Sequence, residues 1–287
     1  MLCSFFSSGY EVVNADSVQV YRHLDIGSAK ADKKVTDIIP HHLIDILQPW
    51  ENFNVADFIR LADEACKKIY ENGNIPVLSG GTAYYFKHFM YGLSDAPKAE
   101  PEIRNSVASW MKEVGQEDAY EYLKTIDPVS ADKININDSY RISRAIEVYK
   151  ASGKPLSSFK VPDTPRNNMD VVAIGLCRDK SELDSRIRER VKIMFKAGLI
   201  DEIKKLIDMG ANLSWQSMQA IGYREFLVSL EENNGNFDRL DFDDIAEQIV
   251  MNSIHYAKRQ MTFFRSFADA HWVSPDNTDE LKDVLKL

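Results

Sequence analysis

Short apolar runs alternate with an amphipathic stretch over the first hundred residues of the chain. Three runs rich in apolar and β-branched residues end in polar or turn residues, which is typical of strands in a buried sheet: residues 10–15, 43–47 and 75–79. Between the second and third runs, apolar residues recur at helical spacing over residues 55–71, and Asn72-Gly73 ends that pattern. The order strand, helix, strand predicts a parallel α/β layer.

Helical spacing dominates the middle of the chain. It covers three segments that are separated by loops, with no strand-like run among them: residues 103–113, 118–125 and 140–151. Residues 101–165 are therefore predicted to form an α-helical insertion.

Strand-like and helical patterns return after this insertion. They predict, in order, a strand at residues 171–176, a helix over 180–209 that ends at Gly210, a helix over 244–264 and a short strand near Trp272. We therefore predict an α/β core formed by residues 1–100 and 166–287, interrupted by the helical insertion of residues 101–165.

The composition is that of an ordinary folded protein, with 44% hydrophobic and 28% charged residues among 287. No segment approaches the roughly 18 apolar residues of a membrane span, and the first residues lack the basic start and long apolar run of a secretory signal. We therefore expect a cytoplasmic protein without a membrane segment. The three cysteines, Cys3, Cys66 and Cys177, lack paired spacing, which argues against a disulfide framework and a zinc site. The adjacent histidines His41 and His42 lack partner ligands at metal spacing, so we interpret them as structural and predict no protein-built metal site.

The net charge of −9 counts against a polyanionic partner, but one segment differs from this average. Residues 248–268 contain no acidic residue. In this segment cations are interleaved with aromatic residues: Lys258, Arg259 and Arg265 with Tyr256, Phe263, Phe264 and Phe267. Such a mixture suits contacts to an RNA backbone and stacking on bases. The alternative is a helix with an apolar core face and a solvated basic face.

Polar residues follow two of the predicted strands. Gly80-Gly81-Thr82 lies between the strand at residues 75–79 and a helix, where glycines allow close backbone approach and a helix start favours an anion. A plain tight turn is the alternative. Asp16 lies at the end of the first strand, where α/β folds bind ligands, although an isolated carboxylate there can also be a helix cap.

The motifs around these residues resemble those of the tRNA dimethylallyltransferase family in order and spacing. In the first hundred residues they read NADSVQVYRHLDIGSAK, PHHLIDIL, NVADF and PVLSGGTAYYFK. Further along, DSYRISRAIEVYKASGK is similar to the arginine-bearing segment of the family's insertion, MQAIGYRE to its Gly-Tyr-Arg motif and AKRQMTFFR to its basic carboxyl-terminal motif. Several long motifs in one order are highly specific, and they span nearly the whole chain.

The resemblance implies transfer of a dimethylallyl group from dimethylallyl diphosphate to the exocyclic amine of the adenosine adjacent to the anticodon. Asp16 matches the family's catalytic aspartate, which would accept the proton of the amine. The departing diphosphate needs cations and hydrogen-bond donors, usually with Mg²⁺, which is the expected cofactor. Thr82 and Arg224 are the matched positions expected near this reaction channel, Arg224 because a guanidinium pairs bidentately with phosphate oxygens. For Arg224 the alternative is an arginine that satisfies a helix end.

The family's tRNA contacts fall on four regions of this chain and on Arg104, and the anticodon stem-loop is the expected partner of a monomeric protein. The matched residues are Asp16, Ser17, Val18, Gln19, Arg104, Tyr140, Arg141, Arg144, Gln219, Gly222, Tyr223, Arg224, Lys258, Arg259, Gln260 and Arg265. Gln19 has the amide needed to read an adenine edge. Arg144 could instead pair with Glu147 across a helical turn. The helical insertion would grip the anticodon loop, whose target base must leave its stack.

One motif of the family has no counterpart in this sequence. Members begin with a strand and a P-loop, G-x-x-x-x-G-K-S/T, that holds the diphosphate, whereas residues 1–6 resemble the middle of the helix that follows this loop. We therefore expect a P-loop-NTPase-like parallel sheet without its first strand and P-loop. Either the biological protein starts upstream of Met1 or the chain is a degenerate relative.

Two alternative functions stay open. The chain could be a non-catalytic tRNA-binding remnant that lost its donor site, or a prenyltransferase acting on free adenine nucleotides. An enzyme of the second kind needs neither the helical insertion nor the AKRQMTFFR segment, so the sequence favours tRNA.

Overall fold

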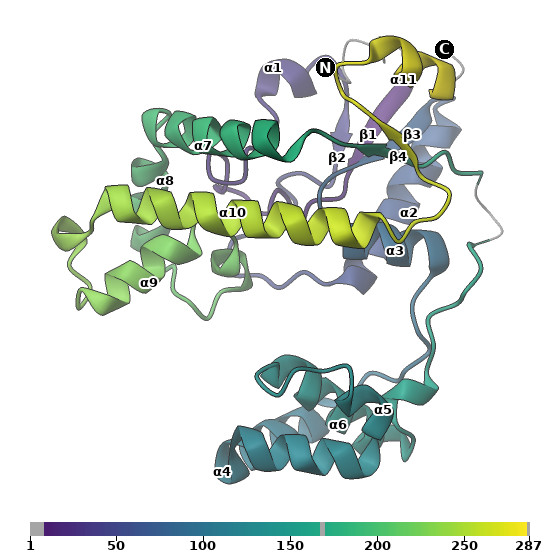
Figure 1. Cartoon of the computed structure of the whole chain (residues 1–287), viewed down its shortest axis with the longest axis vertical. Helices are drawn as coiled ribbons and strands as arrows, with labels where there is room; N and C mark the ends of the chain where they lie inside the picture. The colour runs from purple at the N-terminus through teal and green to yellow at the C-terminus, as the bar shows by residue number, and fades with distance from the viewer. Residues whose placement is uncertain (1–8, 167–169, 286–287) are drawn as a thin grey trace. The chain divides into compact units, whose positions relative to one another are not determined.

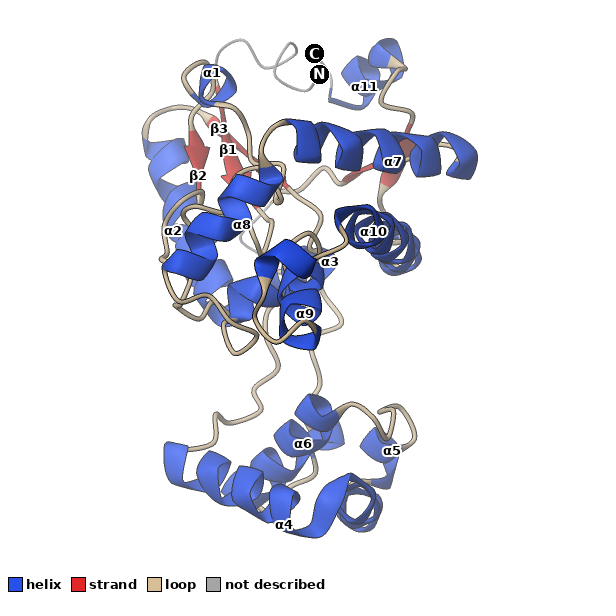
Figure 2. Ribbon diagram, turned by 90° about the vertical axis from the view of Figure 1, so that its left-hand side faces the viewer, coloured by secondary structure: helices blue, strands red, loops and turns tan. Residues whose placement is uncertain are grey.

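The computed structural model describes residues 9–166 and 170–285, which form two compact units (Figures 1 and 2). The core unit comprises the described residues up to His88 and from Asp170 onward, and the helical unit comprises Phe89 to Arg166. Residues 1–6, which the sequence assigns to the middle of a helix, lie outside the described residues. Each unit is described by itself.

The core unit is built on parallel strands, which confirms the predicted α/β class. β1 (Tyr10–Asn14) lies between β2 (His41–His42) and β3 (Ile75–Ser79), and Val12 pairs with His41 on one side and Val77 on the other. A second parallel pair consists of β4 (Ile174–Leu176) and β5 (His271–Val273). α2 (Val55–Glu71) packs against β1 and β3, as expected of a crossover helix.

The ends of α2 follow from local chemistry. The Asn54 side chain accepts hydrogen bonds from the amides of Ala56 and Asp57, which satisfies two of the donors at the helix start. Gly73, at a φ of 78°, reverses the chain after the helix. Phe58 of α2 stacks on Tyr85, with ring centroids 4.3 Å apart, and thereby joins α2 to α3 (Ala83–Tyr91).

Two elements differ from the sequence-based prediction. The strand predicted at residues 43–47 is wrong: β2 ends at His42, and left-handed φ values of 63° at Leu43 and 54° at Asp45 break any strand that follows. The helix predicted over 180–209 is two helices, α7 (Lys180–Lys196) and α8 (Leu199–Asp208), because Gly198 has a φ of 103°. This glycine redirects α8 away from the axis of α7.

The remaining elements of the core unit are mostly helical. They are α1 (Lys33–Thr36), α9 (Arg224–Glu232), α10 (Phe242–Phe264), α11 (Thr278–Leu285) and the short 3-10 helices Gln216–Gln219 and Phe237–Arg239. α10 packs against α7 and α9, as Figure 1 shows. None of the helices in the described part of the chain is long and apolar enough to cross a membrane.

The helical unit contains α4 (Pro101–Ile126), α5 (Pro128–Ala131), α6 (Ser139–Ser152) and the 3-10 helix Leu156–Ser158. Gly115, at a φ of 87°, kinks α4, which explains why the sequence shows two separate helical patterns there. Its core is formed by buried apolar residues of all three α-helices and the following loop: Val107, Ala119, Leu123, Ala131, Ile134, Ile142, Ala145 and Ile146.

The turn between β3 and α3 requires glycine at its first position. A Cβ at Gly80 would overlap the backbone carbonyl of Ala15, which β1 holds in place, whereas a Cβ at Gly81 would meet only the amide end of the Gln260 side chain. We expect Gly80→Ala to lower the free energy of unfolding by about 3 kcal/mol, since overpacking against backbone cannot relax. Gly81→Ala is the matched control and should cost clearly less. Urea unfolding of both variants measures the difference, and equal midpoints would contradict this account.

Candidate active site

Asp16 lies in the loop that leaves β1 and forms the centre of the candidate site. Its Oδ1 accepts hydrogen bonds from the amides of Val18 (2.8 Å) and Gln19 (3.2 Å), so the carboxylate closes a turn in the manner of a cap. Oδ2 takes part in neither bond. The carboxylate is therefore held in one orientation with one oxygen directed elsewhere.

Thr82 joins this loop to the turn after β3. Its hydroxyl accepts a hydrogen bond from the amide of Ser17 (3.1 Å) and lies 3.3 Å from the Ser17 hydroxyl. Its own amide donates to the carbonyl of Ala15 at 3.2 Å. The carboxyl ends of two parallel strands thus bring Asp16, Ser17 and Thr82 together.

The carbonyls of Gly81 and Thr82 accept hydrogen bonds from residues that directly follow the Gly80-Gly81-Thr82 segment. The amide of Ala83 donates to the Gly81 carbonyl (3.1 Å) and that of Tyr85 to the Thr82 carbonyl (2.8 Å). With the Thr82 amide bound to Ala15 as well, this segment has the bonding of a tight turn. The Thr82 hydroxyl, rather than an array of backbone amides, is the polar group that the turn presents beside Asp16.

α10 covers this turn. The side-chain amide of Gln260 donates to the Gly81 carbonyl at 2.7 Å, and the Tyr256 hydroxyl donates to the same oxygen at 3.4 Å. Burial raises the pKa of Tyr256, and the nearby Asp16 carboxylate raises it further. The Tyr256 hydroxyl therefore stays protonated at neutral pH and acts as a donor near Asp16. Gln260, assigned to tRNA from its motif, holds α10 on the turn.

Arg190 of α7 is the residue that the sequence analysis did not single out. Loss of hydration lowers the pKa of its guanidinium, while attraction to the Asp16 carboxylate acts in the opposite direction. A guanidinium stays charged under all relevant conditions, so Arg190, whose side chain is exposed to solvent, is a cation within electrostatic range of the Asp16 carboxylate. Arg186 and Arg188 of the same helix pair with Glu182 and Glu247 instead.

A sequence signal for Arg190 does exist. Arg190 has no acidic residue three or four positions before or after it on the helix. Arg186, in contrast, has Glu182 four positions before it. Arginines at every second position over residues 186–190 are typical of a solvated helix face, so this pattern does not distinguish Arg190 from its neighbours.

The residues of the Gly-Tyr-Arg motif have different environments. Arg224 begins α9 on the surface, and its Nε donates to the Gln219 side chain at 3.2 Å. Tyr223 is fully buried, and its hydroxyl donates to Glu202 at 2.8 Å. Gly222 is also buried, and its amide donates to Glu225 at 2.8 Å. Of these three residues, the structure leaves only the Arg224 side chain accessible to a ligand.

The predicted tRNA contacts of the helical unit lie on or next to α4 and α6. Tyr140 is the most accessible of them, with 80% of its surface exposed. Arg141 pairs with Asp138 at 3.3 Å. Arg144 donates to the Pro97 carbonyl at 3.0 Å and lies 4.0 Å from Glu147, and Arg104 donates to the Ala99 carbonyl at 3.0 Å. Arg144 and Arg104 thus have partners within the unit.

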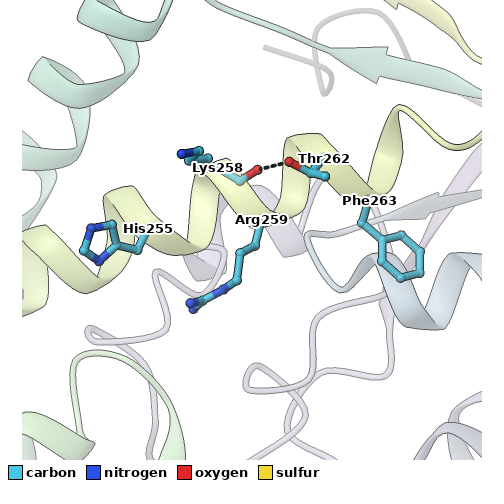
Figure 3. A pocket seen from close by; sticks show the side chains of 5 residues that line it. All are labelled: His255, Lys258, Arg259, Thr262 and Phe263. Carbon is cyan, nitrogen blue, oxygen red and sulfur yellow. Dashed lines mark hydrogen bonds between the residues drawn. The ribbon is translucent and has the colours of Figure 1, made fainter. Parts of the chain in front are cut away.

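A basic hollow follows one stretch of α10 (Figure 3). It has a volume of about 450 Å³ and is lined by His255, Lys258, Arg259, Thr262 and Phe263. Lys258 and Arg259 are exposed, and Lys87 of α3 adds a further cation 5.9 Å from the centre of the Phe263 ring. Arg265, also exposed, follows the last turn of α10. Together these side chains form a positively charged surface on a chain whose net charge is negative.

The described residues contain no cluster of three or more histidine, cysteine or acidic side chains that could hold a metal ion. His42 instead bonds to Glu11 at 2.6 Å, and Asn74 donates to the same carboxylate at 2.8 Å. The hydrogen bond from His42, followed by that from Asn74, lowers the pKa of Glu11. The described cysteines, Cys66 and Cys177, form no disulfide.

Comparison with known proteins shows the family of this chain. The IPP transferase family model matches residues 19–267. The chain is 40% identical to a tRNA dimethylallyltransferase of Borrelia turicatae over 96% of this chain and 89% of that protein. It also resembles the full-length tRNA isopentenylpyrophosphate transferase of Bacillus halodurans, with 35% identity, a TM-score of 0.65 and coverage of 99% of this chain and 88% of that one.

A eukaryotic dimethylallyltransferase acting on tRNA matches as well, with a TM-score of 0.77, 25% identity and coverage of 98% of this chain and 71% of that one. The class is thus a prenyl-group transferase built on a parallel α/β core. The chain belongs to the IPP transferase family, whose matched members are tRNA dimethylallyltransferases, and the resemblance predicted from its motifs is confirmed.

Proposed function

We propose that this chain transfers a dimethylallyl group from dimethylallyl diphosphate to the exocyclic amine of the adenosine adjacent to the anticodon in tRNA. One observation carries the proposal: in a chain of this family, the loop that holds the Asp16 carboxylate is hydrogen-bonded to the Thr82 hydroxyl where β1 and β3 end, and the guanidinium of Arg190 lies within electrostatic range of Asp16. A base, a donor and a cation are what this reaction requires.

Asp16 is the proposed general base. As the amine nitrogen bonds to the first carbon of the dimethylallyl group, the bond from that carbon to the diphosphate oxygen breaks and the nitrogen must lose one proton. The Val18 and Gln19 amides engage Oδ1, which leaves Oδ2 to accept this proton. An amine conjugated with a purine ring is a poor nucleophile, so a base held in place accelerates its attack.

The leaving diphosphate gains charge as its bond to carbon breaks. Arg190 supplies a fork of donors that matches two phosphate oxygens, and the Thr82 hydroxyl adds a neutral donor. Arg224 is assigned to the same diphosphate on its motif match. A Mg²⁺ ion carried by the diphosphate would neutralise part of its charge, and the Ser17 and Thr82 hydroxyls are suitable oxygen ligands for it.

We assign the tRNA contacts to three places. Gln19 lies next to Asp16 in the chain and reads the target adenine, Tyr140 and Arg141 of the helical unit contact the anticodon stem-loop, and the basic hollow of α10 binds backbone phosphates. Exposed aromatic and cationic side chains suit an unstacked loop, which is the form in which a target base becomes accessible.

The direct test supplies dimethylallyl diphosphate, Mg²⁺ and unmodified tRNA, and analyses the nucleosides for prenylated adenosine. Prenylation next to the anticodon supports the proposal. Specific tRNA binding without any transfer would favour a non-catalytic tRNA-binding protein instead. Transfer to free adenosine nucleotides in preference to tRNA would assign the chain to the other alternative class.

The basic surface of α10 yields a separate prediction. We expect replacement of Lys258, Arg259 and Arg265 by Gln to weaken tRNA binding and to flatten the plot of log affinity against log salt by about two units of slope, because fewer counterions are released. Measurement of the dissociation constant at several salt concentrations tests this.

A control variant with the same loss of charge neutralises three cations of α2, namely Arg60, Lys67 and Lys68. It should retain the salt dependence of the unaltered chain. If the two triple variants have equal slopes, the α10 surface is an ordinary solvated helix face.

A further inference from the structure

A buried carboxylate on α8 organises the loop that follows Leu24. Glu202 is only 8% exposed, yet it accepts hydrogen bonds from three successive backbone amides: Oε2 from Asp25 (3.0 Å) and Ile26 (2.7 Å), and Oε1 from Gly27 (3.1 Å). The Tyr223 hydroxyl donates to the same Oε1 at 2.8 Å. Four donors converge on one side chain about 175 residues away in sequence from the loop it binds.

This loop needs an external anchor. Ala29 has a left-handed φ of 51°, a conformation that costs free energy for a residue with a Cβ and persists only where surrounding contacts enforce it. A Cβ at Gly27 would lie 2.6 Å from the Tyr223 ring, so this position has no room for a side chain. On the other side, Lys30 bonds to Asp25 and Asp45, each at 2.6 Å. The loop is therefore held by two sets of contacts, one with Glu202 and Tyr223 and the other through Lys30.

The loop in turn determines which way the Gln19 amide points. The Nε2 of Gln19 donates to the carbonyls of Ser28 (3.1 Å) and Ala29 (3.4 Å). Two acceptors on one side require the NH₂ group there, so the amide oxygen points the opposite way. Within the described residues, that oxygen accepts no hydrogen bond from the protein. Gln19 therefore presents an acceptor, three residues after Asp16 in the chain.

A hydrogen-bond acceptor at the Gln19 side chain favours a base that offers a hydrogen-bond donor. The exocyclic amine of adenine donates a hydrogen bond from the edge at which guanine carries an acceptor oxygen. The same amine is the nucleophile of the proposed reaction. If the loop shifted, the Ser28 and Ala29 carbonyls would no longer fix the amide, and Gln19 could rotate to present its NH₂ group instead.

We propose that Glu202 is a positioning residue that, through the loop of residues 25–29, orients the Gln19 amide so that its oxygen recognises the exocyclic amine of the target adenosine. This inference rests on the proposed function, since it assumes that Gln19 contacts the target base. It assigns to α8 a part in base selection, although α8 itself contributes no group to the reaction.

The test measures binding selectivity, so it does not depend on turnover. The full chain is titrated with two anticodon stem-loop RNAs that differ only at the target position, which carries adenosine or purine riboside. Purine riboside lacks the exocyclic amine. The unaltered chain should bind the adenosine RNA about three- to tenfold more tightly, which is the effect of one hydrogen bond. In Glu202→Gln, the side-chain NH₂ group must face at least one of the loop amides that now donate to the carboxylate, so the ratio of the two affinities should fall toward one.

The matched control is Glu11→Gln. Glu11 is a buried carboxylate of β1, 6% exposed, that also accepts hydrogen bonds from distant residues but does not contact the loop. This variant should lose thermal stability and keep the selectivity ratio. Tyr223→Phe removes one donor to Glu202 without changing the carboxylate, and it serves as the second variant where Glu202→Gln fails to fold. Its ratio should be intermediate.

The outcomes separate the two levels of the proposal. A folded Glu202→Gln protein, or a folded Tyr223→Phe protein in its place, that keeps the full selectivity ratio overturns the positioning role of Glu202 and leaves the proposed function intact. An unaltered chain that binds neither RNA contradicts the proposed function itself. Loss of selectivity in Glu11→Gln to the same extent as in Glu202→Gln would show a general effect of destabilisation and would also overturn the inference.

Discussion

Replacement of Asp16 by Asn is expected to slow prenyl transfer by about 10²- to 10⁴-fold, the range typical of losing a general base. The substitution is conservative for the fold, because the amide oxygen of Asn can still accept hydrogen bonds from Val18 and Gln19 and because Asn is as good a cap as Asp. What it removes is the ability of the second oxygen to accept a proton. The measurement is single-turnover transfer to tRNA, alongside the dissociation constant for tRNA.

A suitable control for this experiment is Asp32→Asn. Asp32 also closes a turn by accepting a backbone amide, that of Lys34 at 3.1 Å, but it does so at α1. It should retain both rate and affinity. A transfer rate in Asp16→Asn equal to that of the unaltered chain would remove Asp16 from the mechanism. If the chain transfers the dimethylallyl group too slowly to measure, the same two substitutions are compared in a chain to which the P-loop segment of a relative has been added.

Arg190→Gln should have the second largest effect. We expect the rate of transfer at low donor concentration to fall by about 10²- to 10³-fold, the usual result of removing one group that stabilises developing charge. The loss should show in the kinetic constants for dimethylallyl diphosphate, and the affinity for tRNA should change little. Arg190→Lys should recover only part of the activity, because an ammonium group keeps the charge but lacks the planar fork of donors.

The neighbouring Arg188 provides the matched control on the same helix. Arg188 pairs with Glu247 at 2.8 Å on the surface, and such exposed pairs contribute at most about 1 kcal/mol. Arg188→Gln should therefore change the rate by less than about fivefold. Equal effects at the two positions would mean that a general loss of positive charge on α7, rather than the location of Arg190 beside Asp16, accounts for the result.

Local sequence pattern determined much of the scaffold and part of the site. β1, β3, α2 and α10 lie where periodicity and turn residues predict them, since each depends on its own side chains and on stop signals such as Asn72-Gly73. The family resemblance placed Asp16 and Thr82 near one reaction channel, and their two loops meet because parallel neighbouring strands end at the same edge. These features follow from interactions that are short in sequence or from a general property of parallel sheets.

Only the tertiary structure decided the roles that depend on long-range contacts. The periodicity of residues 180–209 predicts one helix, but the left-handed backbone of Gly198 divides it into α7 and α8. The new direction of α8 allows Glu202 to bind the loop of residues 25–29. The same packing buries Tyr223 and brings Arg190 within electrostatic range of Asp16. A helical pattern shows which side chains share a face, but it contains no information on what that face meets, because the partner lies more than a hundred residues away along the chain.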